Sequence, residues 1–305
     1  MNRFILSILV VSFPLKLLGQ MFPLSDHYDV NALAINPAYA GCQDALSLTA
    51  SYRNQWVGFK DAPKSYILSV HTPVYNDRVG LGLLVENNSI GIFIETSFFG
   101  NYAYRMELGE GKLALGLGFG VTVSHISWNE LVAADENDIQ LMNNPSSAVI
   151  PDFSLGMYYY TNKYYFGISL PLFLSSELDK NTGKYKISNN LSGYNYFFSG
   201  GYELEISPQV KFLPSVLIKY HPKNPVQIDY NARISLKDKV WMGISYRSKD
   251  ILVGMVQCQL NYQLRMGYSY DYNLGDIGKY MNGSHEFVLN YVFKYSRKVI
   301  GPRQF

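Results

Sequence analysis

Two short motifs near the amino end of the sequence carry the residues best suited to specific hydrogen bonding. The first, NPAYAG, runs from Asn36 to Gly41, and the second, YRNQWVGF, holds Arg53, Gln55 and Trp56 within residues 52–59. Asn-Pro and Gly set rigid turns, and an Asn side chain can cap backbone N–H groups. An Arg donates strongly to carboxylates and carbonyls. The chemistry that these residue types predict is binding and bracing, not the making or breaking of bonds.

Signatures of catalysis are absent from the sequence. It has no nucleophile elbow, HExxH, CxxC, phosphate loop or dinucleotide fingerprint. The five histidines are dispersed, without a second ligand at the spacing of a metal site. An acidic cluster, Asp135, Glu136 and Asp138, lacks the alternating ligands and Gly of a calcium loop. We therefore predict no enzyme activity, no cofactor, no catalytic residue and no metal site.

The composition favours a membrane-embedded β protein without nucleic-acid partners. The chain has 305 residues, a net charge of +2 and 16% charged residues, with no basic cluster that would neutralise phosphates. It carries 26 Tyr and 17 Phe against 3 Trp, a load of rings that is expected at a membrane interface. Soluble β-sandwiches are also Tyr-rich, so the ring content supports a membrane barrel without proving one.

The first residues are typical of a secretory signal peptide. Arg3 precedes an apolar stretch from Phe4 to Phe13, and Gly19 stands at the expected cleavage point, which gives a signal peptide over residues 1–19. No apolar run of 18 residues follows, so a membrane protein of this sequence must cross the membrane with strands. Cys42 and Cys258 are far apart, and we expect two separate thiols.

From Ala45 onward, apolar and polar residues alternate, which is the period of a β-strand with two different faces. In residues 226–237 the even positions are apolar or aromatic and the odd positions are polar, and residues 264–273 and 286–295 repeat the pattern. The template predicts strands at 45–53, 64–74, 79–88, 95–107, 112–126, 151–160, 164–170, 194–205, 209–220, 225–237, 240–248, 250–260, 263–273 and 284–295. These fourteen strands predict an all-β, transmembrane antiparallel β-barrel.

Most connections between the predicted strands alternate in length, with short periplasmic turns and longer extracellular loops, but the outer connections near 221–224 and at Lys249 are short. The longer ones are 53–63, 88–94, 127–150, 171–193 and 274–283. We expect a bacterial outer-membrane location with both termini periplasmic. The domains are then a signal peptide (1–19), an N-terminal periplasmic or lumenal segment (20–44), the barrel (45–295) and a C-terminal tail (296–305).

The predicted lumen carries charges of both signs. Its members are Arg53, Arg105, Lys112, Lys211, Arg233, Arg247 and Arg265, with Glu86, Glu107, Asp229, Asp271 and Glu286, joined by Phe99 and Trp241. Such a lining is suited to an interior that is filled by its own side chains or by a plug, with charges paired across it. It does not distinguish a plugged lumen from an open one.

The order and spacing of the two motifs resemble the start of the PorP/SprF family, outer-membrane barrels of type IX secretion and gliding motility in Bacteroidetes. The matching residues are Asn36, Pro37, Ala38 and Gly41, then Arg53, Gln55, Trp56, Gly58 and Phe59. The resemblance extends more loosely from about residue 20 to the end. It implies a docking or assembly barrel whose partners are outer-membrane lipid, periplasmic ring or peptidoglycan-linked components, and in some members the C-terminal domain of an exported adhesin.

The candidate partner-binding or structural residues are those of the two motifs, Asn36, Pro37, Tyr39 and Gly41, and Arg53, Gln55, Trp56 and Gly58. We expect the first set to make a rigid turn that docks the N-terminus, and the second to brace the first outer loop. The two sets lie at opposite ends of the first strand, so they meet only if the N-terminal segment threads up the lumen. Both sets can equally serve barrel stability alone.

Two other functions remain open. One is an outer-membrane porin or hydrophobic-solute channel, because the fold does not dictate the function. The other is a soluble all-β sandwich, in which the Tyr and Phe faces would form a core.

Overall fold

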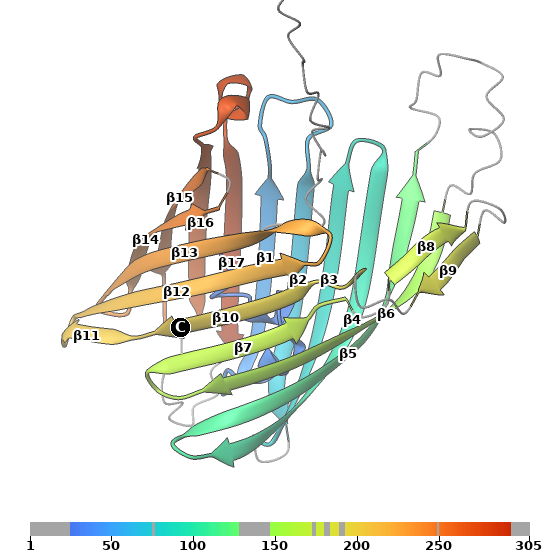
Figure 1. The fold of residues 1–305 in the computed structure, drawn as a ribbon. Coiled ribbons are helices and arrows are strands. Elements are labelled where there is room, and N and C mark those ends of the chain that lie inside the picture. The colour runs from blue at the N-terminus through green and yellow to red at the C-terminus, as the bar shows by residue number, and fades with distance from the viewer. Residues whose placement is uncertain are drawn as a thin grey trace, which may run out of the picture.

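In the computed structural model, residues 25–74, 77–127, 147–172, 175–179, 184–188, 193–248 and 250–293 are described. They form a closed antiparallel β-barrel of 14 strands (Figure 1). From β1 to β7 and from β12 to β17, each strand pairs with the next one in sequence. β1 also pairs with β17, and β10 pairs with β7 and β12, which closes the ring. This confirms the predicted fold class.

The first half of the barrel consists of β1 (Leu46–Asn54), β2 (Lys64–Val74), β3 (Val79–Ile90), β4 (Phe93–Leu108), β5 (Gly111–Ile126), β6 (Ser147–Tyr160) and β7 (Tyr164–Leu170). The second half consists of β10 (Tyr196–Tyr202), β11 (Leu204–Ser207), β12 (Val210–His221), β13 (Asn224–Leu236), β14 (Val240–Arg247), β15 (Ile251–Gln259), β16 (Leu264–Asn273) and β17 (Ser284–Phe293). Three short 3-10 helices are η1 (Ala32–Ala34), η2 (Pro37–Tyr39) and η5 (Asp276–Tyr280).

The predicted strands agree with the observed ones except at three places. β6 begins at Ser147, four residues before the predicted start, because residues 147–150 continue the pairing with β5 as far as His125. The strand predicted at 194–205 is divided into β10 and β11, which both pair with β12. The connection at 171–193 contains a separate hairpin of β8 (Ser175–Asp179) and β9 (Lys184–Ser188).

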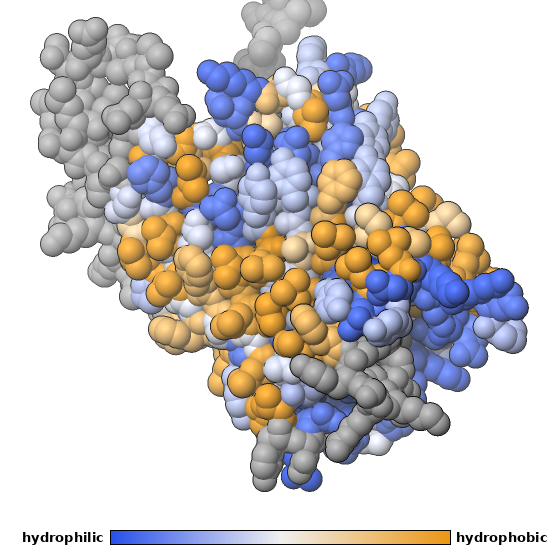
Figure 2. Space-filling model, turned by 180° about the vertical axis from the view of Figure 1, so that it is seen from behind, coloured by the Kyte–Doolittle hydropathy of each residue, from blue (hydrophilic) through white to orange (hydrophobic). Residues whose placement is uncertain are grey.

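The two faces of the strands differ as the alternation predicts. In β13, Tyr230 is 53% exposed, whereas the flanking Asp229 and Asn231 are buried inside the barrel. The same holds for Leu289 and Asn290 of β17. Figure 2 shows a belt of hydrophobic side chains across the middle of one outer face, between more hydrophilic zones. This belt has the character of a surface that meets lipid.

Residues 25–44 lie inside the ring of strands and form the contents of the lumen (Figure 1). Ser25 and Asp26 contact Glu286 and Arg53 near the end of the barrel that carries the long connections. Gly41 contacts His71 and Gly80 near the end that carries the tight turns. The segment therefore runs down the lumen before the chain enters β1 at Leu46.

The first and last described residues lie at opposite ends of the barrel. Phe293 pairs with Leu46 at the tight-turn end, whereas Ser25 lies at the long-connection end. The predicted signal peptide, the predicted cleavage point and the periplasmic position of the mature N-terminus concern residues before Ser25, outside the described ranges, as does the C-terminal tail. Among the described residues, no helix is long and apolar enough to cross a membrane. Cys42 and Cys258 are both free thiols.

Candidate functional site

The NPAYAG motif fastens the lower part of the lumenal segment to the wall made by β6 and β7. Oδ1 of Asn36 accepts a hydrogen bond from the N–H of Ala38 at 3.0 Å. Nδ2 of the same side chain donates to the carbonyl of Met157 at 3.0 Å. Pro37 opens η2, where a missing N–H leaves no bond unmade. One Asn thus shapes the turn and attaches it to the barrel.

Tyr39 and Gly41 join the motif to β2, and Tyr39 also packs on β6. The Tyr39 ring meets the rings of His71 and Tyr158 edge-on, with centroids 5.5 Å apart in both pairs. Gly41 has a φ of 71°, and its N–H donates to Nδ1 of His71 at 3.2 Å. A side chain at residue 41 would be strained by that φ, and it would also meet Gly80 Cα at 2.7 Å.

Three glycines on lumen-facing positions of the strands form a flat strip under the motif, which we call the glycine strip: Gly80, Gly116 and Gly156. A Cβ at Gly80 would lie 1.9 Å from the carbonyl oxygen of Ala40, and one at Gly116 would lie 2.1 Å from the nitrogen of Ala38. A Cβ at Gly156 would lie 2.0 Å from Oδ1 of Asn36. The backbone of the motif therefore packs directly on the backbone of the strands.

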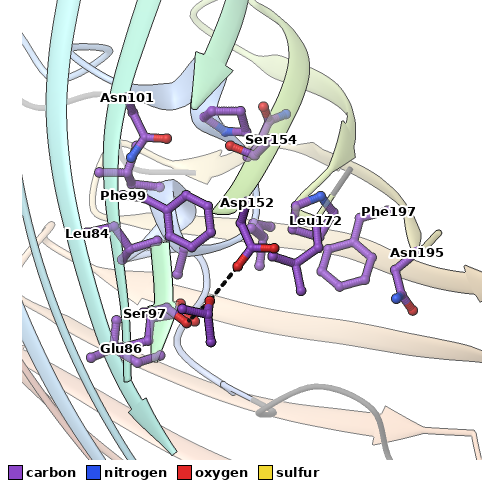
Figure 3. A pocket seen from close by; sticks show the side chains of 18 of the residues that line it. Leu84, Glu86, Ser97, Phe99, Asn101, Asp152, Ser154, Leu172, Asn195 and Phe197 are labelled. Carbon is purple, nitrogen blue, oxygen red and sulfur yellow. Dashed lines mark hydrogen bonds between the residues drawn. The ribbon is translucent and has the colours of Figure 1, made fainter. Parts of the chain in front are cut away.

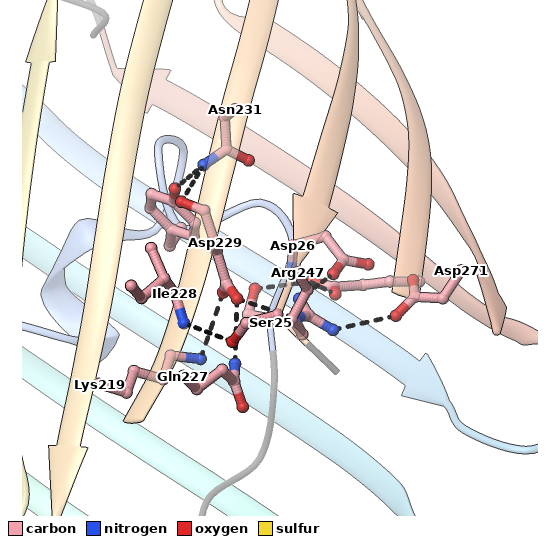
Figure 4. Close-up of polar contacts among 12 residues, drawn as sticks. Ser25, Asp26, Lys219, Gln227, Ile228, Asp229, Asn231, Arg247 and Asp271 are labelled. Carbon is pink, nitrogen blue, oxygen red and sulfur yellow. Dashed lines mark hydrogen bonds and ion pairs between the residues drawn. The ribbon is translucent and has the colours of Figure 1, made fainter. Parts of the chain in front are cut away.

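The upper part of the segment is held by charge (Figure 4). Asp26 accepts from Arg53 at 2.7 Å and from Arg247 at 2.8 Å, and the two guanidinium groups also contact Asp271 of β16. Burial alone would raise the pKa of the Asp26 carboxyl, but Arg53 and Arg247 hold it well below its usual range. Glu286 joins the cluster through Arg53 at 3.1 Å and through the N–H of Asp26 at 2.8 Å.

Asp29, three residues after Asp26, likewise lies between two arginine side chains. Its carboxylate pairs with Arg233 and lies 3.6 Å from Arg265, while Nε2 of Gln257 donates to it at 3.3 Å. Together with the cluster at Asp26, five carboxylates meet five cations on this side of the lumen: Asp26, Asp29, Asp229, Asp271 and Glu286, with Arg53, Lys219, Arg233, Arg247 and Arg265. The predicted lumenal charges are thus paired in part through the segment itself.

His27 lies between the two acidic residues and is fully buried. Its Nδ1 faces Nε2 of Gln257 at 2.8 Å, and because an amide N–H donates, Nδ1 accepts and the ring is neutral. Burial lowers the pKa of His27 from 6.5 to about 4, and the carboxylates of Asp29 and Asp26 oppose that shift.

The second motif lies at the long-connection end of the barrel, at and after the end of β1. Arg53 points into the charge cluster. Trp56 has a φ of 52°, and its backbone N–H donates to Oγ of Ser284 at 3.1 Å. The N–H of Val57 donates to Gly283 and its carbonyl accepts from Asn282, so the first long connection is joined to the one between β16 and β17.

Gln55 is buried, and Gly58 is exposed with a φ of 105°. The two motifs therefore stand at opposite ends of the lumen. They are linked through Asp26, which belongs to the same segment as Asn36 and contacts Arg53.

A cavity of about 320 Å³ remains between the segment and the wall of β3–β6 (Figure 3). Its lining includes Leu84, Glu86, Phe99, Asn101 and Asp152. Residues 33–37 of the lumenal segment form another side of it. Thr122 donates to Oδ2 of Asp152 at 2.5 Å, and Ser97 lies 2.7 Å from Oγ1 of Thr122. The lining of the cavity combines apolar side chains with carboxyl groups.

Sequence patterns did not single out Asp26, His27, Asp29 or the glycine strip. A signal for the glycines exists, because Gly80, Gly116 and Gly156 fall on the lumen face of alternating strands, beside further small residues such as Gly82, Ala114 and Gly118. The motif DHYD at residues 26–29 carries two acidic groups just ahead of NPAYAG. Its partners are, however, 27 to 260 positions away, which no local pattern reveals.

Within the described ranges, no group of three or more His, Cys, Asp or Glu side chains is arranged to hold a metal ion. The acidic cluster at Asp135, Glu136 and Asp138 lies outside those ranges.

Comparison with known proteins gives one family. The model of a family described as "Type IX secretion system membrane protein PorP/SprF" matches residues 18–291. No curated protein matches the chain.

Among solved structures, the chain is similar to the outer membrane protein Omp33 of Acinetobacter baumannii, with a TM-score of 0.48 and 8% identity over 83% of this chain and 100% of that one. It is also similar to the CymD monoaromatic hydrocarbon channel, with a TM-score of 0.48 and 10% identity over 88% and 94% of the two chains. The KdgM porin gives a TM-score of 0.40 and 9% identity over 81% and 99%.

Proposed function

We propose, since the chain belongs to the PorP/SprF family of type IX secretion system membrane proteins, that it is a non-enzymatic docking and assembly barrel of that system in the outer membrane. Its work is to hold components of the secretion or gliding machinery. The partners we propose are periplasmic ring or peptidoglycan-linked components and the C-terminal domain of an exported adhesin, with lipid around the barrel.

One observation carries the proposal: residues 25–44 occupy the lumen and are bonded to its wall at both ends. A diffusion pore needs a hydrated passage that solutes can enter and leave. Here the acidic groups of the segment neutralise the arginines that would line such a passage. A barrel with this filled interior is better suited to presenting its ends and connections to partners than to conducting solutes.

The motif residues take two proposed roles. Asn36, Pro37, Tyr39 and Gly41 hold the lumenal segment near the tight-turn end, next to the surface that a periplasmic partner would meet. Arg53, Gln55, Trp56 and Gly58 brace the first long connection, next to the surface that an adhesin domain would meet. In this orientation the tight turns are periplasmic.

Two measurements on the purified full-length chain test the proposal. In a planar bilayer, we expect the wild-type barrel to stay closed, while Asp26→Asn combined with Asp29→Asn opens because the arginines lose their partners on the lumenal segment. Asp276→Asn on the exposed η5 is the matched control. Affinity purification from native membranes with mass spectrometry should recover type IX secretion components with the wild type. Large, steady wild-type currents without those components would instead favour an outer-membrane porin or hydrophobic-solute channel.

A further inference from the structure

The cavity beside the lumenal segment is lined by carboxyl groups that have no ion-pair partner among the described residues. Three carboxyl groups line it, Glu86 of β3, Glu95 of β4 and Asp152 of β6. None of them forms an ion pair with a described residue. Among the described residues of the lining, the only cation is Lys219, which is already 3.8 Å from Asp229. The opposite side of the lumen, in contrast, balances five carboxylates with five cations.

Asp152 accepts a hydrogen bond from a neighbouring hydroxyl group (Figure 3). Thr122 has a single hydroxyl proton, and it donates that proton to Oδ2 of Asp152 at 2.5 Å. Ser97 must therefore donate to Thr122 across their 2.7 Å contact. This chain of two hydroxyl groups ends on the carboxylate and favours its ionised form. Asp152 is itself 5% exposed, and no described residue donates to its second oxygen.

Two amide side chains in the same lining are incomplete. Nδ2 of Asn101 is buried and has no hydrogen-bond partner among the described residues, and the residue is only 5% exposed. Oδ1 of Asn88 is likewise buried and without a partner. Buried polar atoms are almost always paired in proteins, and each one left open costs free energy. The cavity thus offers a carboxylate and an amide oxygen to a donor, and an amide N–H to an acceptor.

The remaining wall is apolar. Ile67, Leu84 and Phe99 form a buried cluster, and Leu172 of the chain after β7 packs against it. A bare metal ion makes no favourable contact with apolar side chains. Among the described residues, no group of three acidic side chains is arranged to ligate one. An ammonium group at the end of an aliphatic stem fits both halves, because such a side chain buries its stem along apolar surface and keeps its head among polar groups. The volume of about 320 Å³ lies at the lower end of the range for ligand sites.

We propose that this cavity binds a primary ammonium group on an aliphatic stem, either the lysine side chain of a polypeptide or a free aliphatic amine. The ammonium group lies among Glu86, Asp152 and Asn88, and the stem lies on Leu84 and Phe99. In the polypeptide case, Nδ2 of Asn101 donates to a backbone carbonyl of the ligand. The site depends on the lumenal segment, which supplies part of its lining, but it does not depend on the proposed docking function.

Isothermal titration of the purified, full-length barrel in detergent tests the site with three probes. These are an N-acetylated, C-amidated Ala-Lys-Ala peptide, the same peptide with norleucine for lysine, and 1,5-diaminopentane. We expect the lysine peptide to bind, the norleucine peptide not to bind, and affinity to fall as salt is added. Tighter binding of the peptide than of the diamine identifies a polypeptide as the source, and equal binding identifies the free amine class.

Variants locate the site. Asp152→Asn and, independently, Glu86→Gln should weaken binding of the lysine peptide at least about tenfold, because each removes a charge-assisted hydrogen bond. Glu107→Gln changes an exposed carboxylate near the tight-turn end of β4 and should bind as the wild type does. Heat-modifiable migration on gels checks that each variant is folded. Equal binding of the norleucine peptide, full affinity in both folded cavity variants, or no binding by the folded wild type would overturn the proposal.

Discussion

At the scale of single residues, Arg53 does the most to join the lumenal segment to the barrel. It contacts Asp26 of the segment, Asp271 of β16 and Glu286 of β17, and it is 3% exposed. Because the site is buried, loss of the Arg53 cation would leave three carboxylates close together without that counter-charge. The cost in folding free energy is then set by the desolvation of those carboxylates, and it is larger than the small contribution of an exposed ion pair.

Replacing Arg53 by Met should therefore destabilise the folded barrel by about 3–5 kcal/mol. The midpoint temperature of heat-modifiable migration measures this effect. Lys64→Met removes a cation of similar length from an exposed position of β2 and should leave the midpoint nearly unchanged. If both variants melted at the same temperature as the wild type, the charge cluster would not stabilise the barrel.

His27 predicts a pH dependence of the seated segment. Its pKa is about 4 when buried and 6.5 when it is free, so the free state binds more protons between those values. The seated state keeps its full advantage above pH 6.5 and loses about 3 kcal/mol as the pH falls to 4. The charged groups that face this ring are Asp26, Asp29, Arg233 and Arg265.

Protease cleavage within residues 25–44, followed from pH 7 to pH 4, measures how often the segment leaves its seat. We expect cleavage to increase below pH 6.5 in the wild type. In His27→Gln the increase should be confined to lower pH, where Asp26 takes up a proton, because the pKa of that carboxyl is held well below its usual range. The same onset in both chains would show that His27 does not titrate on release.

The alternation of the first strand predicts that Arg53 faces the lumen, and its residue type predicts that it donates hydrogen bonds. The structure confirms that its side chain points inward. The sequence did not identify Asp26 as a partner, because residues 20–44 have no alternation from which a face can be assigned. The pairing depends on which side chains of β14, β16 and β17 converge in three dimensions, and one sequence carries no signal of that convergence.

At the scale of elements, the glycine strip shows how a segment with little regular structure is held by regular strands. η2 is three residues long and has no amphipathic face of its own. It is positioned because β3, β5 and β6 have no side chain where its backbone passes. The attachment is therefore steric, and it requires glycine at all three positions of the glycine strip.

Gly116→Ala tests this attachment, because the added Cβ would lie 2.1 Å from the nitrogen of Ala38. The seated segment should lose about 1–3 kcal/mol, as in other overpacked sites, and protease cleavage within residues 25–44 should rise. Gly254→Ala is the matched control, since it is also a strand glycine and its Cβ would meet nothing within 4 Å. Unchanged cleavage in Gly116→Ala would mean that the motif is held without the strip.

Strand prediction succeeded because one face of every strand meets lipid and the other meets polar groups, so that a period of two survives along the whole barrel. Residues 147–150 were assigned to a loop because Ala148, Val149 and Ile150 are all apolar and show no alternation. Pairing with β5 extends the strand regardless. The hairpin of β8 and β9 was missed because it lies outside the barrel wall and lacks a lipid-facing side to mark it.

At the scale of the whole molecule, the barrel has two unlike ends. One end carries the tight turns, together with the first residue of β1 and the last residue of β17. The other end carries the long connections, η5 and Ser25, the first described residue of the lumenal segment. The orientation proposed above places the second end at the cell surface.

One cysteine placed at either end, in a Cys258→Ser background that keeps the buried Cys42, tests this orientation. Asp276→Cys on η5 should react with a membrane-impermeant maleimide on intact cells, because that side chain is 95% exposed at the long-connection end. Asn162→Cys in the tight turn between β6 and β7 should react only after the outer membrane is permeabilised. Labelling in the reverse order would invert the barrel and exchange the proposed places of the partners.

The contact between Asp26 and Glu286 joins residues 260 positions apart. During synthesis the acidic end of the segment is made early, while β17, which supplies Glu286, is made almost last. The segment therefore cannot complete its bonds in a partial chain, and the seal forms only when the first and last strands have met. The complete ion cluster is therefore present only in molecules in which β1 has paired with β17. A factor that binds the lumen while residues 25–44 are not yet bonded there would bind incompletely folded barrels and dissociate from folded ones.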